Sequence, residues 1–305
     1  MSNYLLDANG KYLVDANGKR LIVAPLAAPS LGPIWVAGSD GSLATLNHDG
    51  SLGPHATVGD MSSLIGICKA GSSACITGVS AASGQGFALV DVTGSLVGSF
   101  HAISGAIAIQ FPSIVNGEIW MLDLDVNHIY RFNTDGSSAG ADIVLSASGY
   151  QGPSGHYGAA AALDLGSDLV WIALNYLGKI LQLHYDGTSA GSEITPPEVG
   201  PQAFAFDGTH VWLASSGGDG SLTVLATDGS TIADYNAPSS AQYGVNGIAY
   251  IDGRIWAANQ LTYANDYSSG PTGDVTIYNL DGSMYGSAIT DPSLSYPNDI
   301  AAIGT

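Results

Sequence analysis

The chain has 305 residues and a formal net charge of −19, with 7 lysines and arginines against 26 aspartates and glutamates. A field of this sign repels phosphate backbones and anionic lipid, which excludes nucleic acid and acidic membrane surfaces as partners. Apolar residues make up 46% of the chain and charged residues only 11%. This composition predicts a sizeable core built from short strands and tight turns rather than from solvated helices.

The start of the chain shows no basic segment followed by an apolar one, and no apolar run approaches the ~20 residues of a spanning helix. We therefore expect neither a Sec signal nor a transmembrane segment. A cytoplasmic protein, a protein exported without a signal and a virion component released by lysis all agree with this start. Of these, we expect a virion or an extracellular surface.

Residues 4–23 repeat with a period of eight, as YLLDANGK, YLVDANGK and RLIVA. The D-A-N-G-K joints are typical of type I turns with a left-handed glycine, so we expect a three-stranded meander within residues 1–24. Strands this short need a surface to pack on, either the following domain or another chain. We favour an anchor to another chain or copy, with residues 25–32 as a stiff Pro-containing linker. The anchor residues would be Tyr4, Leu5, Leu6, Tyr12, Leu13, Val14, Lys19 and Arg20.

Residues 33–305 divide into units of roughly 40 to 50 residues, the period of β-propeller blades. Each unit has an inner strand of small residues, a second strand that carries a tryptophan in five units, and a third strand that ends in a glycine turn. The first unit begins at Trp35 without an inner strand, whereas residues 299–305 form an inner strand without a blade. Joining the two closes a ring, so we predict an all-β, six-bladed β-propeller with its tryptophans packed between neighbouring blades.

Two cysteines, Cys68 and Cys75, flank a hairpin turn in the second unit, which has no tryptophan. Opposed positions on antiparallel strands can bring two sulfur atoms within bonding range. A disulfide and two buried free thiols are both open, and the spacing is not that of a metal or redox site.

A metal site has one candidate, Asp123, Asp125 and Asn127, because alternate residues of a strand place three oxygens on one face. The glycine and the final glutamate of a calcium loop are missing, so we interpret this segment as a strand end, with calcium as the alternative. Two G-x-S-x-G segments, at residues 136–140 and 187–191, occupy one repeat position and are interpreted as turns. We expect no catalytic residue and no cofactor.

Two insertions exceed the repeat length, at residues 148–157 and 260–274. Both mix tyrosine with glycine, serine and asparagine, a composition suited to adaptable polar contacts around flat rings. The predicted ligand-binding residues are Tyr150, Tyr157, Tyr263 and Tyr267.

The repeat of a tryptophan strand, a hairpin and Asp-Gly-Ser resembles six-bladed propellers of the NHL and virginiamycin B lyase-like type, over residues 33–305. In the lyases that this pattern resembles, histidine and glutamate face the central channel with a divalent metal. No blade of this sequence shows a matching set, so no catalytic residue is carried over. The D-A-N-G-K repeat resembles attachment segments of phage tail or capsid-surface proteins.

Three functions remain open at this point. The first is a non-enzymatic component of a virion or an extracellular assembly, anchored through residues 1–24 to other assembly proteins. The second is a module that binds carbohydrate or a cell surface through the tyrosine loops. The third is a metal-dependent lyase or hydrolase. We favour the first, in an oligomer or a larger assembly, because the meander needs a surface to cover it.

Overall fold

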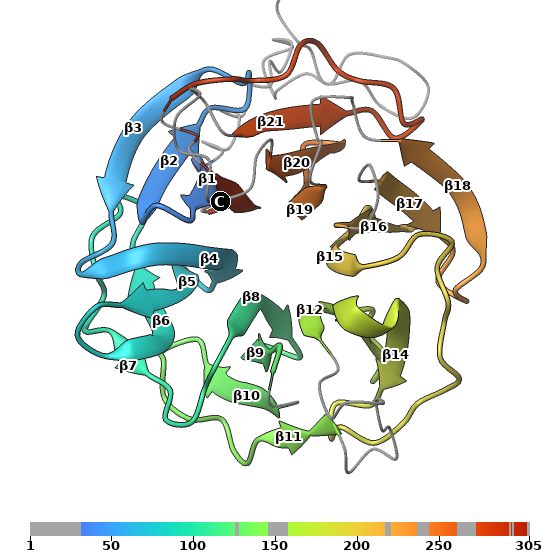
Figure 1. Cartoon of the computed structure of the whole chain (residues 1–305), viewed down its shortest axis with the longest axis horizontal. Helices are drawn as coiled ribbons and strands as arrows, with labels where there is room; N and C mark the ends of the chain where they lie inside the picture. Colours follow the sequence, from blue (N-terminus) through green and yellow to red (C-terminus); the bar gives the residue numbers. More distant parts are fainter. Residues whose placement is uncertain are drawn as a thin grey trace, which may run out of the picture. The chain divides into compact units, whose positions relative to one another are not determined.

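A computed structural model gives the architecture of the chain, in which one compact unit spans Pro33–Gly304 (Figure 1). The structure describes residues 32–125, 128–145, 158–216, 221–236, 244–260, 273–292, 294 and 296–303. The predicted meander at 1–24 and most of the predicted linker lie outside the described residues.

Six antiparallel sheets of three or four strands form the blades of a β-propeller, as the repeat predicts. Blade 1 contains, from the axis outward, β22 (Pro297–Ala302), β1 (Ile34–Gly38), β2 (Ser42–Leu46) and β3 (Leu52–Thr57). Blade 2 contains β4 (Met61–Ala70), β5 (Ser73–Ser80), β6 (Gly84–Val90) and β7 (His101–Ala102). Blade 3 contains β8 (Ile109–Val115), β9 (Glu118–Asp123), β10 (His128–Asn133) and β11 (Ile143–Val144).

The other three blades follow the same order. Blade 4 contains β12 (Ala159–Asp164), β13 (Val170–Leu174) and β14 (Lys179–Leu183), with the short 3₁₀ helix η2 (Asn175–Leu177) between the last two. Blade 5 contains β15 (Pro201–Phe206), β16 (Val211–Ser215), β17 (Ser221–Leu225) and β18 (Thr231–Asn236). Blade 6 contains β19 (Val245–Ile251), β20 (Arg254–Gln260) and β21 (Gly273–Tyr278). Single bridges, Ile180 to Ile194 and Val275 to Ile289, supply the outer edges of blades 4 and 6.

The last strand of the chain closes the ring, as predicted. β22 pairs antiparallel with β1, with Ala301 opposite Trp35 and Ile300 opposite Val36. Blade 1 is therefore built from both ends of the propeller sequence, which leaves no unpaired inner edge between the first and sixth blades.

The five tryptophans each pack against the next blade, and each is at most 1% exposed. Trp35 of β1 lies in one cluster with Leu64 and Ile76 of blade 2, and Trp212 lies with Val245 and Ile255 of blade 6. Burying a large ring at each junction supplies apolar area that thin sheets lack.

In blade 2 a cysteine takes the tryptophan position. Cys75 lies directly opposite Cys68 of the inner strand, as Trp120 lies opposite Ser113 in blade 3. Both thiols are free in this structure, and Cys75 is fully buried. The volume between blades 2 and 3 is filled by third-strand rings instead, because Phe87 packs on Phe132 with 4.7 Å between ring centroids.

The third strand of every blade ends in a turn with a left-handed glycine, such as Gly50 with φ 84° and Gly229 with φ 88°. An aspartate in each turn accepts hydrogen bonds from the residue two positions later, as Asp49 does from the Ser51 backbone and hydroxyl. The two G-x-S-x-G segments lie just past these turns, with the Ser138 hydroxyl donating to the Gly140 carbonyl. The sequence interpretation of these segments as turns is confirmed.

Within the part of the chain that the structure describes, no helix has the length and apolar character needed to cross a bilayer.

Candidate binding site in the axial channel

The inner strands of all six blades line a cavity of about 310 Å³ on the axis of the propeller. Figure 1 shows these innermost strands around the centre of the ring. A pocket of this size lies at the lower end of the range for small-molecule sites. The channel is therefore the first place to search for a binding or catalytic site.

One repeat position supplies most of the polar groups of this cavity. In each blade one residue of the inner strand pairs with the tryptophan, or with Cys75 in blade 2. This repeat position is the residue that directly follows that partner in the inner strand. In blades 2, 4 and 6 this position holds Lys69, Asp164 and Tyr250, and all three line the cavity. In blades 1, 3 and 5 it holds Ala302, Ile114 and Phe206. Polar and apolar groups thus alternate around the axis.

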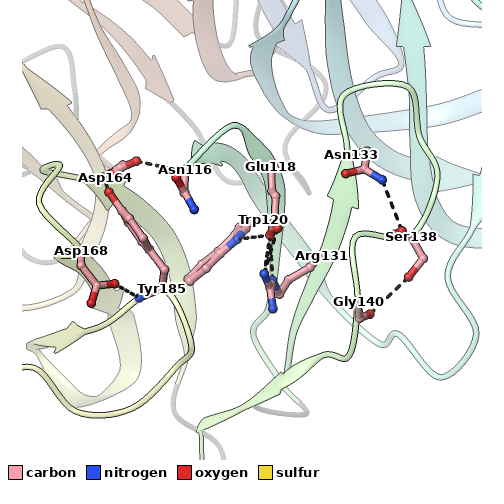
Figure 2. A network of polar contacts seen from close by, with 10 residues as sticks. All are labelled: Asn116, Glu118, Trp120, Arg131, Asn133, Ser138, Gly140, Asp164, Asp168 and Tyr185. Atoms are coloured by element: carbon pink, nitrogen blue, oxygen red, sulfur yellow. Dashed lines mark hydrogen bonds and ion pairs between the residues drawn. The ribbon is translucent and has the colours of Figure 1, made fainter.

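Hydrogen bonds from two blades hold the Asp164 carboxylate (Figure 2). Its Oδ2 accepts from the backbone N–H of Asn116 in blade 3 at 2.8 Å. Its Oδ1 accepts from the Tyr185 hydroxyl at 2.8 Å and from the backbone N–H of Gly166 at 2.7 Å. These donors orient the carboxylate and offset its charge.

A second carboxyl, that of Asp299 on the closing strand, lies in the cavity wall and is 6% exposed. Its Oδ2 accepts from the backbone N–H of Ile67 in blade 2 at 2.9 Å, which joins the first blade to the second at the axis. Burial raises the pKa of Asp299 to about 7, against the opposing effect of the hydrogen bonds from Ile67 and Ile300. Gly247 leaves room for this carboxyl, because a Cβ there would overlap its Oδ1.

The chemistry of the cavity is that of a small amphipathic binding site. Phe111, Pro112 and Phe204 supply apolar wall, and the ammonium of Lys69, the carboxylate of Asp164 and the phenol of Tyr250 supply polar contacts. None of the six histidines in the described ranges lines it. Within those ranges, histidine, cysteine, aspartate and glutamate nowhere gather in a group of three that could hold a metal ion.

Two of the predicted metal residues, Asp123 and Asp125, do not line this channel. Asp123 is fully buried, and its carboxylate accepts from the backbone N–H groups of Ile107 at 2.9 Å and Asp125 at 3.0 Å. This carboxylate thus fixes the chain that leads from blade 2 into blade 3. Asn127 lies outside the described residues, so the metal site stays a prediction.

The other predicted site residues lie outside the described part of the chain. They are the loop tyrosines Tyr150, Tyr157, Tyr263 and Tyr267 and the anchor residues Tyr4, Leu5, Leu6, Tyr12, Leu13, Val14, Lys19 and Arg20. Both sets stay predictions.

Sequence reasoning missed the axial residues Lys69, Asp164, Tyr250 and Asp299. They are far apart in sequence, and no short motif contains any two of them. The repeat itself could have revealed three of them. When the inner strands are aligned on their tryptophan-bearing neighbours, Lys69, Asp164 and Tyr250 fall at one position of the repeat.

Comparison with known proteins shows similarity in fold without similarity in sequence. No protein-family model matches the chain, and no curated protein matches it by sequence. A Bacteroides caccae protein of unknown function superposes with a TM-score of 0.68 at 12% identity, over 90% of this chain and 99% of that one. Virginiamycin B lyase from Staphylococcus aureus gives a TM-score of 0.56 at 16% identity, over 79% and 75% of the two chains. A chain of a nidogen–laminin complex gives 0.62 at 11% identity, over 89% and 98%.

These similarities define the class of the protein as a six-bladed β-propeller. They do not extend to an activity, because proteins with unrelated functions share this fold at the same low identity. The particular role of this chain is therefore argued from its own residues.

Proposed function

We propose that this protein is a non-enzymatic structural and binding protein, a component of a virion or of an extracellular assembly that displays its propeller. Residues 1–24 attach it to other proteins of the assembly or to further copies of itself. The observation that carries the proposal is the pairing of β22 with β1. The described strands of all six sheets lie within Ile34–Ala302, and we expect the propeller to fold without residues 1–24.

The make-up of the axial cavity supports binding rather than the lyase alternative. One of the lyase structures with this fold is described as catalytically inactive after a His-to-Ala change, so that enzyme depends on a histidine. In this chain the described cavity wall carries lysine, aspartate and tyrosine instead. This combination of charged, phenolic and apolar groups is suited to holding a small molecule.

The test compares the full chain with a chain that lacks residues 1–24, by light scattering coupled to size-exclusion chromatography. We expect the full chain to form an oligomer and the shortened chain to be a monomer with an unchanged near-UV circular dichroism spectrum. A full chain that remains a monomer at every concentration contradicts the anchor. A shortened chain that loses its tryptophan signals contradicts the independence of the propeller.

A further inference from the structure

The two cysteines of the chain form one cross-strand pair in blade 2. Cys68 of the inner strand β4 lies directly opposite Cys75 of β5, and the chain has no other cysteine. Direct partners on antiparallel strands have Cα atoms about 4.5–5.5 Å apart and side chains on the same face of the sheet. A disulfide joins Cα atoms about 4.4–6.8 Å apart. The register therefore places this pair within the range of a bridge.

The same cross-strand position is occupied differently in the other five blades. There a tryptophan pairs with an inner-strand residue, which in chain order is Ser113, Leu163, Ala205, Ala249 or Ala301. Blade 2 has two thiols in place of a buried ring and its partner. The blade that lacks a tryptophan thus carries, at that very position, two side chains that can form a covalent bond.

The two thiol groups are in contact. Burial raises the pKa of the Cys75 thiol well above its usual value, and a hydrogen bond with the Cys68 thiol raises it further. Cys75 therefore keeps its proton at neutral pH. Since the thiolate is the reactive form of cysteine, a reaction of this pair begins at Cys68.

Cys68 is also the partner that solvent reaches. Cys75 is fully buried, whereas Cys68 is half-buried and belongs to the wall of the axial cavity. This cavity of about 310 Å³ has room for an oxidant only slightly larger than water, such as hydrogen peroxide. An accessible thiol beside a protected one is the arrangement of an attacking and a resolving cysteine.

The neighbourhood of the pair does not supply the ligands of a metal site. Structural zinc takes four protein ligands. In the ranges that the structure describes, no third histidine, cysteine, aspartate or glutamate joins the two cysteines in a group that could hold a metal ion. Oxidation is therefore the chemistry that these residues favour.

We propose that Cys68 and Cys75 are a peroxide-sensitive redox site that closes to a disulfide between β4 and β5. The Cys68 thiolate attacks one oxygen of hydrogen peroxide, the O–O bond breaks, and the departing hydroxide combines with the proton that Cys68 has lost. The Cys75 sulfur then attacks the Cys68 sulfenic acid, so that the S–S bond forms and the S–O bond breaks, and the Cys75 proton leaves with this oxygen as water. The two thiols lose two electrons, and one peroxide becomes two water molecules.

The bond ties the inner strand of blade 2 to the strand that lacks a tryptophan. It closes the short loop of residues 68–75, which restricts the unfolded chain, so we expect the oxidised protein to melt about 5 °C higher than the reduced one. The pair stays reduced in a cytoplasm and is oxidised outside it. This agrees with the extracellular role proposed above but does not depend on residues 1–24.

The sequence offers a direct assay for the bond. Lys69 is the only lysine or arginine between Arg20 and Arg131, so trypsin separates Cys68 and Cys75 into two peptides with one cysteine each. The full chain is treated with hydrogen peroxide, its remaining thiols are blocked with N-ethylmaleimide in urea, and the digest is analysed by mass spectrometry without reduction. We expect one linked species, about 2 Da lighter than the two peptides together, that dithiothreitol separates. On a non-reducing denaturing gel the oxidised chain should run as a monomer.

Two matched variants assign the roles of the two thiols. Cys75→Ser removes the resolving thiol, so we expect no linked species and a Cys68 sulfenic acid that dimedone traps. Cys68→Ser leaves a buried thiol, which we expect to survive the same peroxide treatment and to react with N-ethylmaleimide only in urea. Near-UV circular dichroism checks that both variants are folded.

The unchanged chain gives the decisive result whether or not the variants fold. The inference is overturned if its two cysteines both remain maleimide adducts after peroxide treatment, or if the disulfide forms only between chains. An oxidised chain that melts no higher than the reduced one would contradict the stabilising effect of the bond on blade 2. A dimedone adduct on Cys75 in the Cys68→Ser variant would contradict the order of attack.

Discussion

The junction between blades 1 and 2 and the junction between blades 5 and 6 are built from the same register but packed differently. In the second, Trp212 is covered by Tyr235 and its N–H donates to Asp207. In the first, Trp35 borders a cavity, and its N–H has no partner. The backbone of a repeat thus fixes where a tryptophan lies, and the outer strand decides whether its junction is sealed or open.

The largest difference should appear when each tryptophan is truncated. Trp212→Ala removes a covered ring and a charge-assisted hydrogen bond, so we expect a loss of about 3–5 kcal/mol in the free energy of unfolding. Trp35→Ala should cost about 1 kcal/mol less, because the Trp35 N–H makes no hydrogen bond whereas that of Trp212 donates to Asp207. Urea unfolding followed by circular dichroism measures both, and an equal or larger loss at Trp35 would contradict the comparison.

The two junctions should also differ in their response to pH. Asp299 joins blade 1 to blade 2 at the axis, whereas the equivalent residue of blade 5 is Ala203. Burial raises the pKa of Asp299 to about 7, so the folded protein holds a proton that the unfolded chain releases near pH 4. Because it binds this proton more tightly than the unfolded chain does, the folded protein is stabilised. The stabilisation is fully present below the pKa of Asp299 in the unfolded chain and is lost as the pH rises through 7.

Between pH 5 and 7 the free energy of unfolding should therefore fall, by up to about 3 kcal/mol from this group. Asp299→Asn, which cannot ionise, should remove this part of the pH dependence. The turn aspartates titrate below this range, because hydrogen bonds from serine and threonine lower their pKa values. A pH profile of the variant that parallels the unchanged chain would show that Asp299 ionises freely in the folded state.

Opening the sealed junction is the next smaller effect. Tyr235 of blade 5 and Ala56 of blade 1 occupy the same register position, so Tyr235→Ala gives blade 5 the small side chain of blade 1. Because Tyr235 is half-buried, we expect a loss of about 2 kcal/mol in the free energy of unfolding. Thermal and urea unfolding measure this loss. A negligible change would mean that Tyr235 does not seal the junction.

Closing the open junction is the smallest effect and has the opposite sign. Ala56→Ile should raise the free energy of unfolding by about 1 kcal/mol, the usual gain from filling a cavity. The control is Ala81→Ile, which adds the same atoms to an exposed turn. Destabilisation by Ala56→Ile alone would mean that the cavity beside Trp35 and Ala56 cannot accept an aliphatic side chain without strain.

Much of this architecture could be predicted from the sequence, because turns and tryptophans recur at fixed places. A glycine turn such as the one after Leu225 ends the third strand of each unit, and the repetition of this turn predicts the number of blades. The unpaired inner strand at residues 299–305 predicts how the ring closes. The open junction could not be found in the same way. β3 is largely exposed and carries no apolar alternation, so nothing in the sequence marks Ala56 as the partner of Leu43. Only the observed register shows that a large side chain is missing there.

The axial residues were missed for a related reason. Asp299 was recognised as part of the closing strand, but its burial depends on Gly247 and on the backbone of Ile67, which only the closed ring brings together. The sequence placed Cys68 and Cys75 on either side of a hairpin turn, and the two residues do pair across the strands. That Cys75 stands where the other blades have a tryptophan is seen only from the strand pairing.

The most direct test of the open junction is a crystal structure of the Ala56→Ile variant of the full chain. We expect the new isoleucine side chain to fill the cavity between Trp35 and Gly94, with β2 and β3 paired as in the unchanged chain. A structure in which this side chain points into solvent, or in which the pairing of β2 with β3 shifts, would contradict the account of this junction.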